Sequence, residues 1–316
     1  MVSKPPQWGE PAPFITAVTD GVANYSIQVT AGRWMVLMAF GSLSNPICAA
    51  AHDEVLARRG LFDDENCLFF GVTVDIDDRN LHHLYNDTPG LRYLWDLDQK
   101  VCHQLGVIDD QFMNPAVFLI DRSYRIFATG GIDQTGEILD LLEQELAREQ
   151  TRQAAEFAPV LLAPRIFEPE FCQTLIDYFN AHEAEESGFA IDMDGKTVTH
   201  VAAHLKRRED VTIEDEALID GVADRMTRRL LPMVERAFGW RATEIERFLI
   251  CRYSEHNQGF FSAHRDNVTA GTAHRKFAVS INLNEPDFEG GEVRFPEFGP
   301  RTYRTPSGGA AVFACG

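Results

Sequence analysis

The first half of the chain is patterned as apolar runs separated by polar turns. Three runs are apolar at nearly every position, at Trp34–Phe40, Cys67–Val74 and Ala116–Asp121. Runs of this kind are typical of strands that are buried on both faces. The segments between and after them favour helices, at Cys48–Leu56, Gln99–Val107 and Glu137–Arg148.

These elements alternate, and the alternation predicts the fold class of this half. Arg125–Ala128 follows a short turn and is expected to pair with the third strand as a hairpin. The order of these elements indicates an α/β fold with a mixed central sheet. It is strand, helix, strand, helix, then a hairpin and a final helix. The polar, charged segment that ends near residue 155 indicates a domain boundary. We therefore expect a first domain over 1–155 and a second over 156–316.

The second half has a different pattern, in which short strands at Val160–Leu162 and Gly195–Lys206 alternate with helices and further strands follow. Proline and two acids at Glu168–Glu170 predict a helix start. Apolar residues recur at helical spacing from Glu214 to Phe238, and Pro232 is expected to bend that helix. Strands are expected from Ile245 onward. Supporting helices followed by many strands predict an α+β domain.

Composition narrows the class of partners. The chain has 316 residues, of which 45% are hydrophobic, and it carries 48 acidic against 29 basic side chains, a net charge of −19. Such a surface repels phosphate groups, so neither nucleic acid nor an anionic membrane is expected as a partner. Neither a signal peptide nor a membrane-spanning run is visible. The six cysteines show no CxxC spacing, which is typical of a reducing compartment, and a cytoplasmic location is expected.

Cys48 is the candidate nucleophile of the first half. It follows a buried strand and a polar turn and opens a helix, and helix N-terminal amides stabilise a thiolate. Three features can be compared with known families: the strand–turn–Cys48–helix arrangement, Asp96–Asp98 before a helix, and Phe118–Asp121. Together they resemble the peroxiredoxin (AhpC/TSA) family, which has a thioredoxin-like fold. The resemblance implies that Cys48 is the peroxide-reacting cysteine, with a thioredoxin-type reductant.

The chain also departs from the pattern of that family. Asn45 stands where the family has threonine or serine, and Gly41 where it has proline. Pro115 replaces the arginine that orients the thiolate and matches instead the cis-proline of thioredoxin-like proteins. Two interpretations of Cys48 therefore stay open, an active thiol peroxidase and a redoxin domain kept as a scaffold. Cys67 and Cys102 are expected to be buried structural cysteines, with Cys102 as a resolving thiol the alternative.

His264 and Asp266 are the candidate metal ligands of the second half. Two residues apart on a strand, they point to the same face and can supply two corners of a 2-His-1-carboxylate iron site. The flanking sequence resembles the prolyl 4-hydroxylase-like Fe(II)/2-oxoglutarate dioxygenases, whose fold is a double-stranded β-helix (jelly roll) with supporting helices. The segments that carry this resemblance are Arg252–Tyr253, Gly259–Phe261, Phe277–Asn284, Gly290–Pro296 and Pro306–Phe313.

The resemblance implies a set of cofactors and ligands. Fe(II) is expected on His264 and Asp266, with 2-oxoglutarate, O₂ and ascorbate as further reactants and a protein or small molecule as the hydroxylated substrate. Tyr253 is expected either to contact 2-oxoglutarate or to be a core residue, and Asn282 to reach the same cosubstrate. The second histidine is expected shortly after Phe313. Because the chain ends at Gly316, we expect this domain to be C-terminally incomplete.

Three functions follow from these features. The first is an Fe(II)- and 2-oxoglutarate-dependent dioxygenase fused to a redoxin domain. The second is a thiol-dependent peroxidase or antioxidant that uses Cys48. The third is a non-enzymatic binding protein, because both candidate sites depart from their family patterns.

Overall fold

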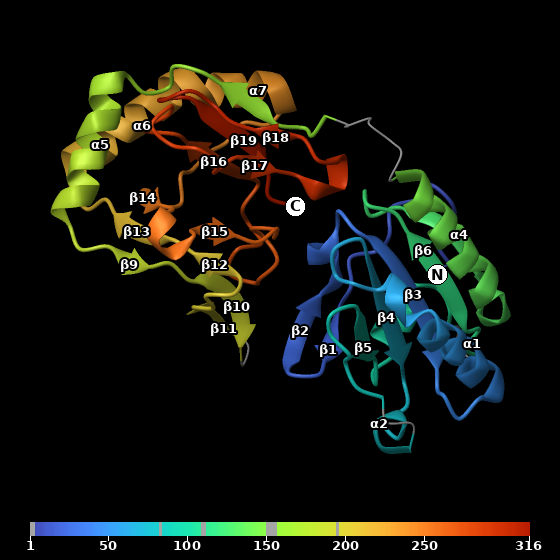
Figure 1. Ribbon diagram of the computed structural model, residues 1–316. Helices are drawn as coiled ribbons and strands as arrows, with labels where there is room; N and C mark the ends of the chain where they lie inside the picture. Colours follow the sequence, from blue (N-terminus) through green and yellow to red (C-terminus); the bar gives the residue numbers. More distant parts are fainter. Residues whose placement is uncertain (1–3, 82–83, 109–111, 150–156, 194–195) are drawn as a thin grey trace. The chain divides into compact units, whose positions relative to one another are not determined.

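The computed structural model describes residues 4–81, 84–108, 112–149, 157–193 and 196–316. The chain divides into two compact units (Figure 1). The first unit comprises Met1–Glu156 with Phe295–Pro300, and the second comprises Phe157–Arg294 with Arg301–Gly316. Among the described residues, no helix is both long and apolar enough to cross a membrane.

The first unit is built on a seven-stranded sheet in the order β2-β1-β5-β4-β3-β6-β7. Its central strands β3, β4 and β5 run parallel, whereas β6 and β7 pair antiparallel beside them. The strands are β1 Thr16–Thr19, β2 Val22–Ser26, β3 Trp34–Gly41, β4 Cys67–Thr73, β5 Leu91–Trp95, β6 Ala116–Ile120 and β7 Ile126–Gly131. The three apolar runs of the sequence are thus β3, β4 and β6, and the predicted mixed sheet is confirmed.

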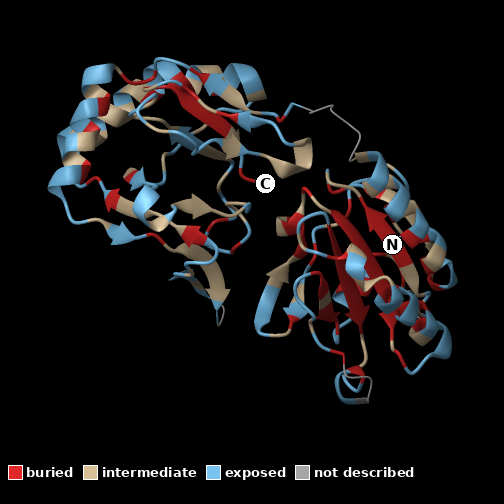
Figure 2. Cartoon of the chain, viewed as in Figure 1, coloured by how far each residue is buried: buried red, intermediate tan, exposed pale blue. Residues whose placement is uncertain are grey.

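Helices cover both faces of this sheet. One core contains side chains of α1 and α4, and the other contains side chains of α3, so the alternating residues of β3 are buried on both sides (Figure 2). The helices are α1 Pro46–Ala57, α2 Asp78–Leu81, α3 Lys100–Gln104 and α4 Thr135–Glu149, with 3₁₀ turns at Ile27–Thr30, Arg59–Leu61 and Ile132–Gln134. Burial on both faces explains why polar residues are absent from the interior of β3 and β4.

One prediction for this unit is wrong. The cis peptide bonds among the described residues precede Pro89 and Pro286, so the bond before Pro115 is trans. The Pro115 carbonyl accepts a hydrogen bond from the Ile132 amide at 3.1 Å, which extends the β6–β7 pairing by one step. Pro115 is therefore an ordinary residue at the start of a strand, where a missing N–H is tolerated.

The second unit has a layer of helices against small sheets. Its helices are α5 Pro169–Ala181, α6 Glu216–Arg225 and α7 Leu231–Phe238, and a π-helical turn at Met226–Leu230 joins the last two. This turn ends two residues before Pro232, whose missing N–H breaks the regular α-helical bonding. The predicted long helix and its irregularity at Pro232 are confirmed. Leu175, Phe179 and Leu230 are among the helical residues of its core.

The strands of this unit form five small sheets among the described residues. Their orders are β10-β11, β12-β15, β14-β13-β9, β16-β19-β8 and β17-β18. The strands are β8 Leu161–Ala163, β9 Glu185–Glu186, β10 Phe189–Met193, β11 Lys196–His200, β12 Lys206–Arg207, β13 Glu209–Thr212, β14 Leu249–Arg252, β15 Phe260–Phe261, β16 Phe277–Ile281, β17 Val293–Arg294, β18 Thr302–Tyr303 and β19 Ala310–Ala314, with 3₁₀ turns at Glu255–Asn257 and Pro296–Phe298. Because these sheets are short and separate, the predicted jelly roll is not confirmed.

Candidate functional site

Cys48 lies in the first turn of α1, as the sequence predicts. The chain leaves β3 at Gly41 and enters α1 at Pro46, a residue suited to the first helical position because no N–H is needed there. The side chain of Asn45 caps the helix by accepting a hydrogen bond from the Ile47 amide at 3.0 Å. Asn45 thus has a structural use at the position where the family pattern has threonine or serine.

The thiol itself is buried. Cys48 is 0% exposed and packs in the core between the sheet and the two helices α1 and α4. A shallow groove of about 330 Å³ runs along another face of α1, lined by Pro46, Ile47, Ala50, Ala51, Glu54, Ile132 and Asp133. Cys48 does not belong to this lining. In this conformation, a peroxide in the groove does not reach the sulfur.

The electrostatic surroundings of Cys48 disfavour a thiolate. Burial raises its pKa, and the negative charge of Asp78 raises it further. The Asp78 carboxylate is fully buried, where it accepts hydrogen bonds from the Leu43 amide at 3.0 Å and the Thr73 hydroxyl at 2.5 Å. Neither cause of the raised pKa of Cys48 is a cation. This agrees with the presence of Pro115 where the family has an arginine. The thiol is thus held mainly in its protonated form at neutral pH.

The other cysteines of this unit lie away from Cys48. Cys67 at the start of β4 pairs with Trp34 at the start of β3. The segment that leads to Cys48 leaves the opposite end of β3, about 20 Å away along the strand. Cys102 belongs to the core on the other face of the sheet. Disulfide formation requires Cα atoms within about 7 Å. Neither cysteine can resolve an oxidised Cys48 without rearrangement of the sheet.

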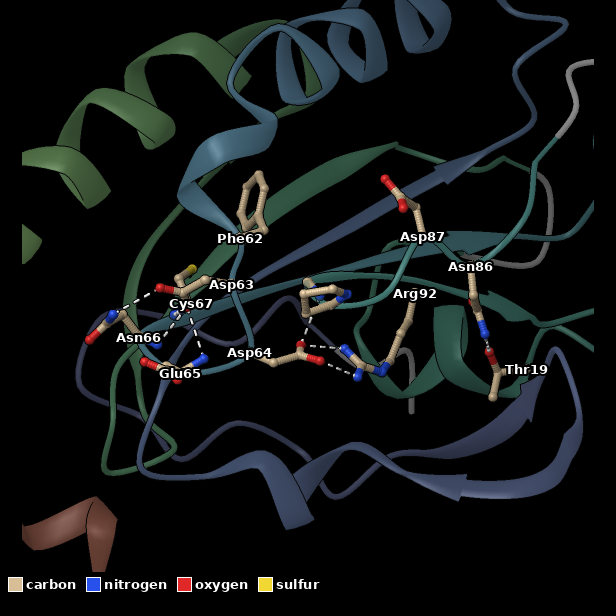
Figure 3. Close-up of polar contacts among 12 residues, drawn as sticks. Thr19, Phe62, Asp63, Asp64, Glu65, Asn66, Cys67, Asn86, Asp87 and Arg92 are labelled. Atoms are coloured by element: carbon tan, nitrogen blue, oxygen red, sulfur yellow. Dashed lines mark hydrogen bonds and ion pairs between the residues drawn. The ribbon is translucent and has the colours of Figure 1, made fainter. Parts of the chain in front are cut away.

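Cys67 and Cys102 have local structural partners instead. The Asp63 carboxylate organises the turn before Cys67 by accepting hydrogen bonds from the amides of Glu65, Asn66 and Cys67 (Figure 3). The carboxylate of Asp96 accepts hydrogen bonds from the Val101 and Cys102 amides, at 2.9 and 2.8 Å. Burial raises the pKa of both thiols. These contacts favour the structural interpretation of both cysteines.

In the second unit, the structure brings His264 and Asp266 together. Nε2 of His264 lies 3.2 Å from Oδ1 of Asp266, and Nδ1 donates to the Ser262 carbonyl at 2.7 Å. The His264 ring also stacks on Phe261, with centroids 3.6 Å apart. The two residues lie in the loop after β15, not in a strand as predicted, so this loop and not the pleat of a strand makes their side chains adjacent.

Two of the three predicted ligand positions are represented by this pair. Because Nδ1 has its hydrogen directed at a carbonyl, Nε2 is the ring nitrogen that faces the carboxylate. Burial acts to raise the pKa of Asp266, but the contacts with His264 and the charges of Arg275 and Arg247 lower it below its ordinary value. Within the described residues, no group of three or more His, Cys, Asp or Glu side chains forms a metal cluster. The donors therefore fall short of a 2-His-1-carboxylate site.

The predicted cosubstrate residues have other contacts. The side-chain amide of Asn282 donates to the Thr305 carbonyl at 2.7 Å, so it holds the turn before β19. Tyr253 follows β14, is 47% exposed and has the Arg208 guanidinium 5.9 Å from its ring centroid. The structure thus places Tyr253 beside a cation and ties Asn282 to a turn.

A charged cluster next to Tyr253 was not singled out from the sequence. Lys206, Arg208 and Asp210 share contacts with Ser187, whose hydroxyl lies 2.6 Å from Lys206 Nζ and 3.1 Å from Arg208 Nη2. Their spacing in the sequence gave no clear signal, because Lys206 lies in β12, Asp210 lies in β13 and Arg208 lies between the two strands.

Comparisons with known proteins give one family model and several solved structures that the chain resembles. Residues 8–128 match the model of the AhpC/TSA family. The reduced 2-Cys peroxiredoxin of Plasmodium vivax is 18% identical, with a TM-score of 0.38 over 46% of this chain and 99% of the other. A peroxiredoxin-like protein from Aquifex aeolicus is 16% identical, with a TM-score of 0.38 over 45% of this chain and 90% of the other. The corresponding values for Xanthomonas campestris peroxiredoxin Q are 18%, 0.35, 42% and 91%.

No curated protein matches the chain. The match to the family model covers less than half of the 316 residues and lies wholly within the first unit. The thioredoxin-like architecture predicted from the sequence is thereby confirmed for this part. Residues 8–128 are a peroxiredoxin-like domain of the AhpC/TSA type with a thioredoxin-like fold.

Proposed function

We propose that the protein is an oxidoreductase whose first unit reduces peroxides through Cys48. The observation that carries the proposal is the place of Cys48 in the first turn of α1, inside the segment that matches the AhpC/TSA model. A helix N-terminus is favourable for a thiolate once burial is relieved. Movement of the first turn of α1 exposes the thiol to solvent and peroxide and removes the main cause of its raised pKa.

The chemistry needs one thiol and an external reductant. The Cys48 thiolate attacks one peroxide oxygen, the O–O bond breaks, and the products are a sulfenic acid and an alkoxide, which takes a proton to become an alcohol. A thiol of the reductant then attacks the sulfenic sulfur and releases water, which leaves a mixed disulfide. A second reductant thiol breaks this bond and restores Cys48. Since Cys67 and Cys102 lie too far away, both reducing thiols come from outside the first unit, and a thioredoxin-type dithiol supplies them.

Peroxide consumption by matched cysteine variants tests this function. With dithiothreitol or thioredoxin as reductant, we expect Cys48→Ser to abolish turnover and Cys67→Ala to retain it. In the wild type, the rate should rise from pH 7 to pH 9, because burial and Asp78 hold the pKa of the thiol above its ordinary value. A sulfenic acid trapped by dimedone on Cys48 identifies the reacting atom by mass spectrometry. Equal turnover by Cys48→Ser and the wild type would exclude the proposal.

A second candidate function is favoured by the contact between His264 and Asp266. We propose that this pair contributes two ligands for Fe(II) in an Fe(II)/2-oxoglutarate dioxygenase, in which iron would supply oxidation of a C–H bond and ascorbate would keep it reduced. The supporting observation is the 3.2 Å separation of the Nε2 and Oδ1 atoms. Two ligands hold a divalent ion only weakly, so the chain as it stands is expected to have little dioxygenase activity.

Metal titration tests this second function without an activity assay. Calorimetry under anaerobic conditions should show weak Fe(II) or Co(II) binding that His264→Ala and Asp266→Asn both abolish. His274→Ala is the matched control, since His274 also lies against a carboxylate, that of Glu246 at 3.3 Å, but outside the pair. Binding that survives in both ligand variants would remove the case for a metal site there.

A further inference from the structure

Helix α1 meets the 3₁₀ turn Ile132–Gln134 along the shallow groove of the first unit. The α1 residues of this groove recur at three- and four-residue spacing and form one stripe of the helix, namely Ile47, Ala50, Ala51 and Glu54. Cys48 lies on the neighbouring stripe, which faces the core. The groove therefore runs directly beside the helical turn that carries the candidate nucleophile.

The floor of the groove is apolar and open to solvent. Ile47, the residue before Cys48, is 59% exposed, although isoleucine is one of the residues most often buried. Ala50, almost one turn further along α1, is also exposed. Ile132 closes the floor from the other side and belongs to the core. An exposed isoleucine that lines a groove offers a contact for an apolar side chain of another molecule.

Two exposed carboxylates belong to the same groove. Glu54 lies over the start of α4, since Glu54 Oε2 would be 2.7 Å from a Cβ added at Gly136. Asp133 turns back over Gly131, where the corresponding distance from its Oδ1 is 2.6 Å. In the part of the chain that the structure describes, neither carboxylate forms an ion pair. The groove thus combines an apolar floor with two negative charges.

The basic residue one turn beyond Glu54 is already engaged. Arg58 forms ion pairs with Asp140 at 2.5 Å and Glu143 at 3.4 Å, both on α4. None of the described residues that line the groove is basic. A positive side chain from another molecule can therefore approach Glu54 without displacing an existing ion pair. Because an exposed ion pair changes an affinity only a few fold, apolar contact has to contribute as well.

We propose that this groove docks the reductant of Cys48, a dithiol protein that presents an apolar side chain followed by lysine or arginine. This inference rests on the proposed peroxidase function. The apolar side chain packs on Ile47 and Ala50, and the basic one pairs with Glu54 or Asp133. A thiol in the same segment then lies next to the turn whose movement exposes the sulfur. Docking itself changes no bond, and the thiol exchange that follows is the one described for the proposed function.

Two synthetic dithiol peptides test the groove on the full chain, with hydrogen peroxide as the substrate. Both contain Cys-Gly-Pro-Cys followed by leucine, and they differ only in the next residue, which is arginine in one peptide and glutamate in the other. The ratio of their kcat/KM values should be about fivefold lower for Glu54→Gln combined with Asp133→Asn than for the wild type. Asp53→Asn, also exposed on α1 but outside the groove, is the matched control and should keep the wild-type ratio.

The apolar floor is tested by Ile47→Ser. This variant should lower kcat/KM for both peptides about threefold relative to that for dithiothreitol, which is too small to need the groove. All the substituted side chains are exposed, so the variants are expected to fold, and circular dichroism checks this. The change in the peptide ratio between variants is independent of the intrinsic reactivity of each peptide and of Cys48.

Three results would overturn the proposal. Turnover with dithiothreitol together with an unchanged peptide ratio in Glu54→Gln/Asp133→Asn rejects the docking groove but leaves the peroxidase function standing. Absence of turnover with every reductant rejects the peroxidase function and the docking groove with it. A dimer in sedimentation equilibrium that Ile47→Asp dissociates would assign the groove to a second copy of the chain instead.

Discussion

In the first unit, β3 and β4 are buried at every position, whereas β16 in the second unit has no buried residue (Figure 2). The strands of the first unit join one continuous sheet with a helix-covered core on each face. Those of the second unit are divided among small sheets whose core lies on the helical side. The first unit thus uses its sheet for stability and keeps its candidate chemistry at one strand end. The second leaves strand faces free to carry charged residues.

The largest expected difference in stability between the two units comes from truncating one side chain in each sheet to alanine. Phe118 in β6 is 0% exposed and Val279 in β16 is 41% exposed. Phe118→Ala should lower the free energy of unfolding of the first unit by about 3–5 kcal/mol, because it leaves a cavity in a close-packed core. Val279→Ala should cost the second unit less than about 1 kcal/mol.

Urea denaturation with pulsed hydrogen–deuterium exchange measures both variants, since mass spectrometry assigns each transition to a unit by its peptides. Comparable losses of stability from Phe118→Ala and Val279→Ala would mean that the two sheets are equally well packed, contrary to the comparison above.

A smaller effect on the free energy of unfolding, which depends on pH, is expected from the buried thiol of Cys67. Burial raises its pKa, so the folded chain keeps this proton at a pH where the unfolded chain has lost it. The unfolded state is therefore favoured as the pH rises above about 8.5, and each such thiol lowers the free energy of unfolding by up to about 1.4 kcal/mol per pH unit. Cys67→Ala should be less stable than the wild type at pH 7, and the gap should narrow toward pH 10.

Val117→Ala, a cavity variant at another fully buried position of the same core, serves as the control. Its deficit relative to the wild type should be the same at both pH values, because it removes no titrating group. A gap for Cys67→Ala that does not change with pH would show that this thiol does not titrate differently in the folded and unfolded chains.

The smallest loss of stability is expected when a side-chain hydrogen bond of the hairpin β10–β11 in the second unit is removed. The Thr197 hydroxyl donates to Asp192 Oδ1 at 2.6 Å and accepts from the Gly271 amide at 2.8 Å. Thr197→Val should therefore expose the Gly271 amide to faster hydrogen exchange, with a global loss of only about 1 kcal/mol. Thr199→Val on the same strand is the control. Unchanged exchange at Gly271 in Thr197→Val would contradict this anchoring role.

Much of the first unit could be predicted from its sequence. Strands buried on both faces must be apolar at consecutive positions, so the runs that became β3, β4 and β6 stand out without structural information. The place of Cys48 at a helix start also follows from its neighbours, because Asn45 and Pro46 are residues suited to a helix N-terminus. What could not be predicted is the raised pKa of Cys48, since it results from burial in the packed core and, less strongly, from Asp78, which comes from a distant part of the chain.

The second unit was predicted less completely for a physical reason. Its strands are two to five residues long, too short for an alternation pattern to specify their partners. The helices were correctly anticipated because the 3.6-residue spacing from Glu214 to Phe238 continues over several turns. His264 and Asp266 were chosen from local spacing, and the structure does bring their side chains into contact. Lys206 and Arg208 could not be singled out from the sequence because the cluster that they form meets Tyr253, which follows the distant strand β14, only in the folded chain.

The sequence by itself determined the thioredoxin-like first unit, the helices of the second and the adjacency of His264 to Asp266, because each depends on residues close together in the chain. Only the tertiary structure decided the protonation of Cys48, the separation of the cysteines of the first unit and the charged cluster of Lys206, Arg208 and Asp210. Burial and charge act through space between segments distant in sequence. The pKa of a thiol and the charge of such a cluster are therefore properties of the packed chain.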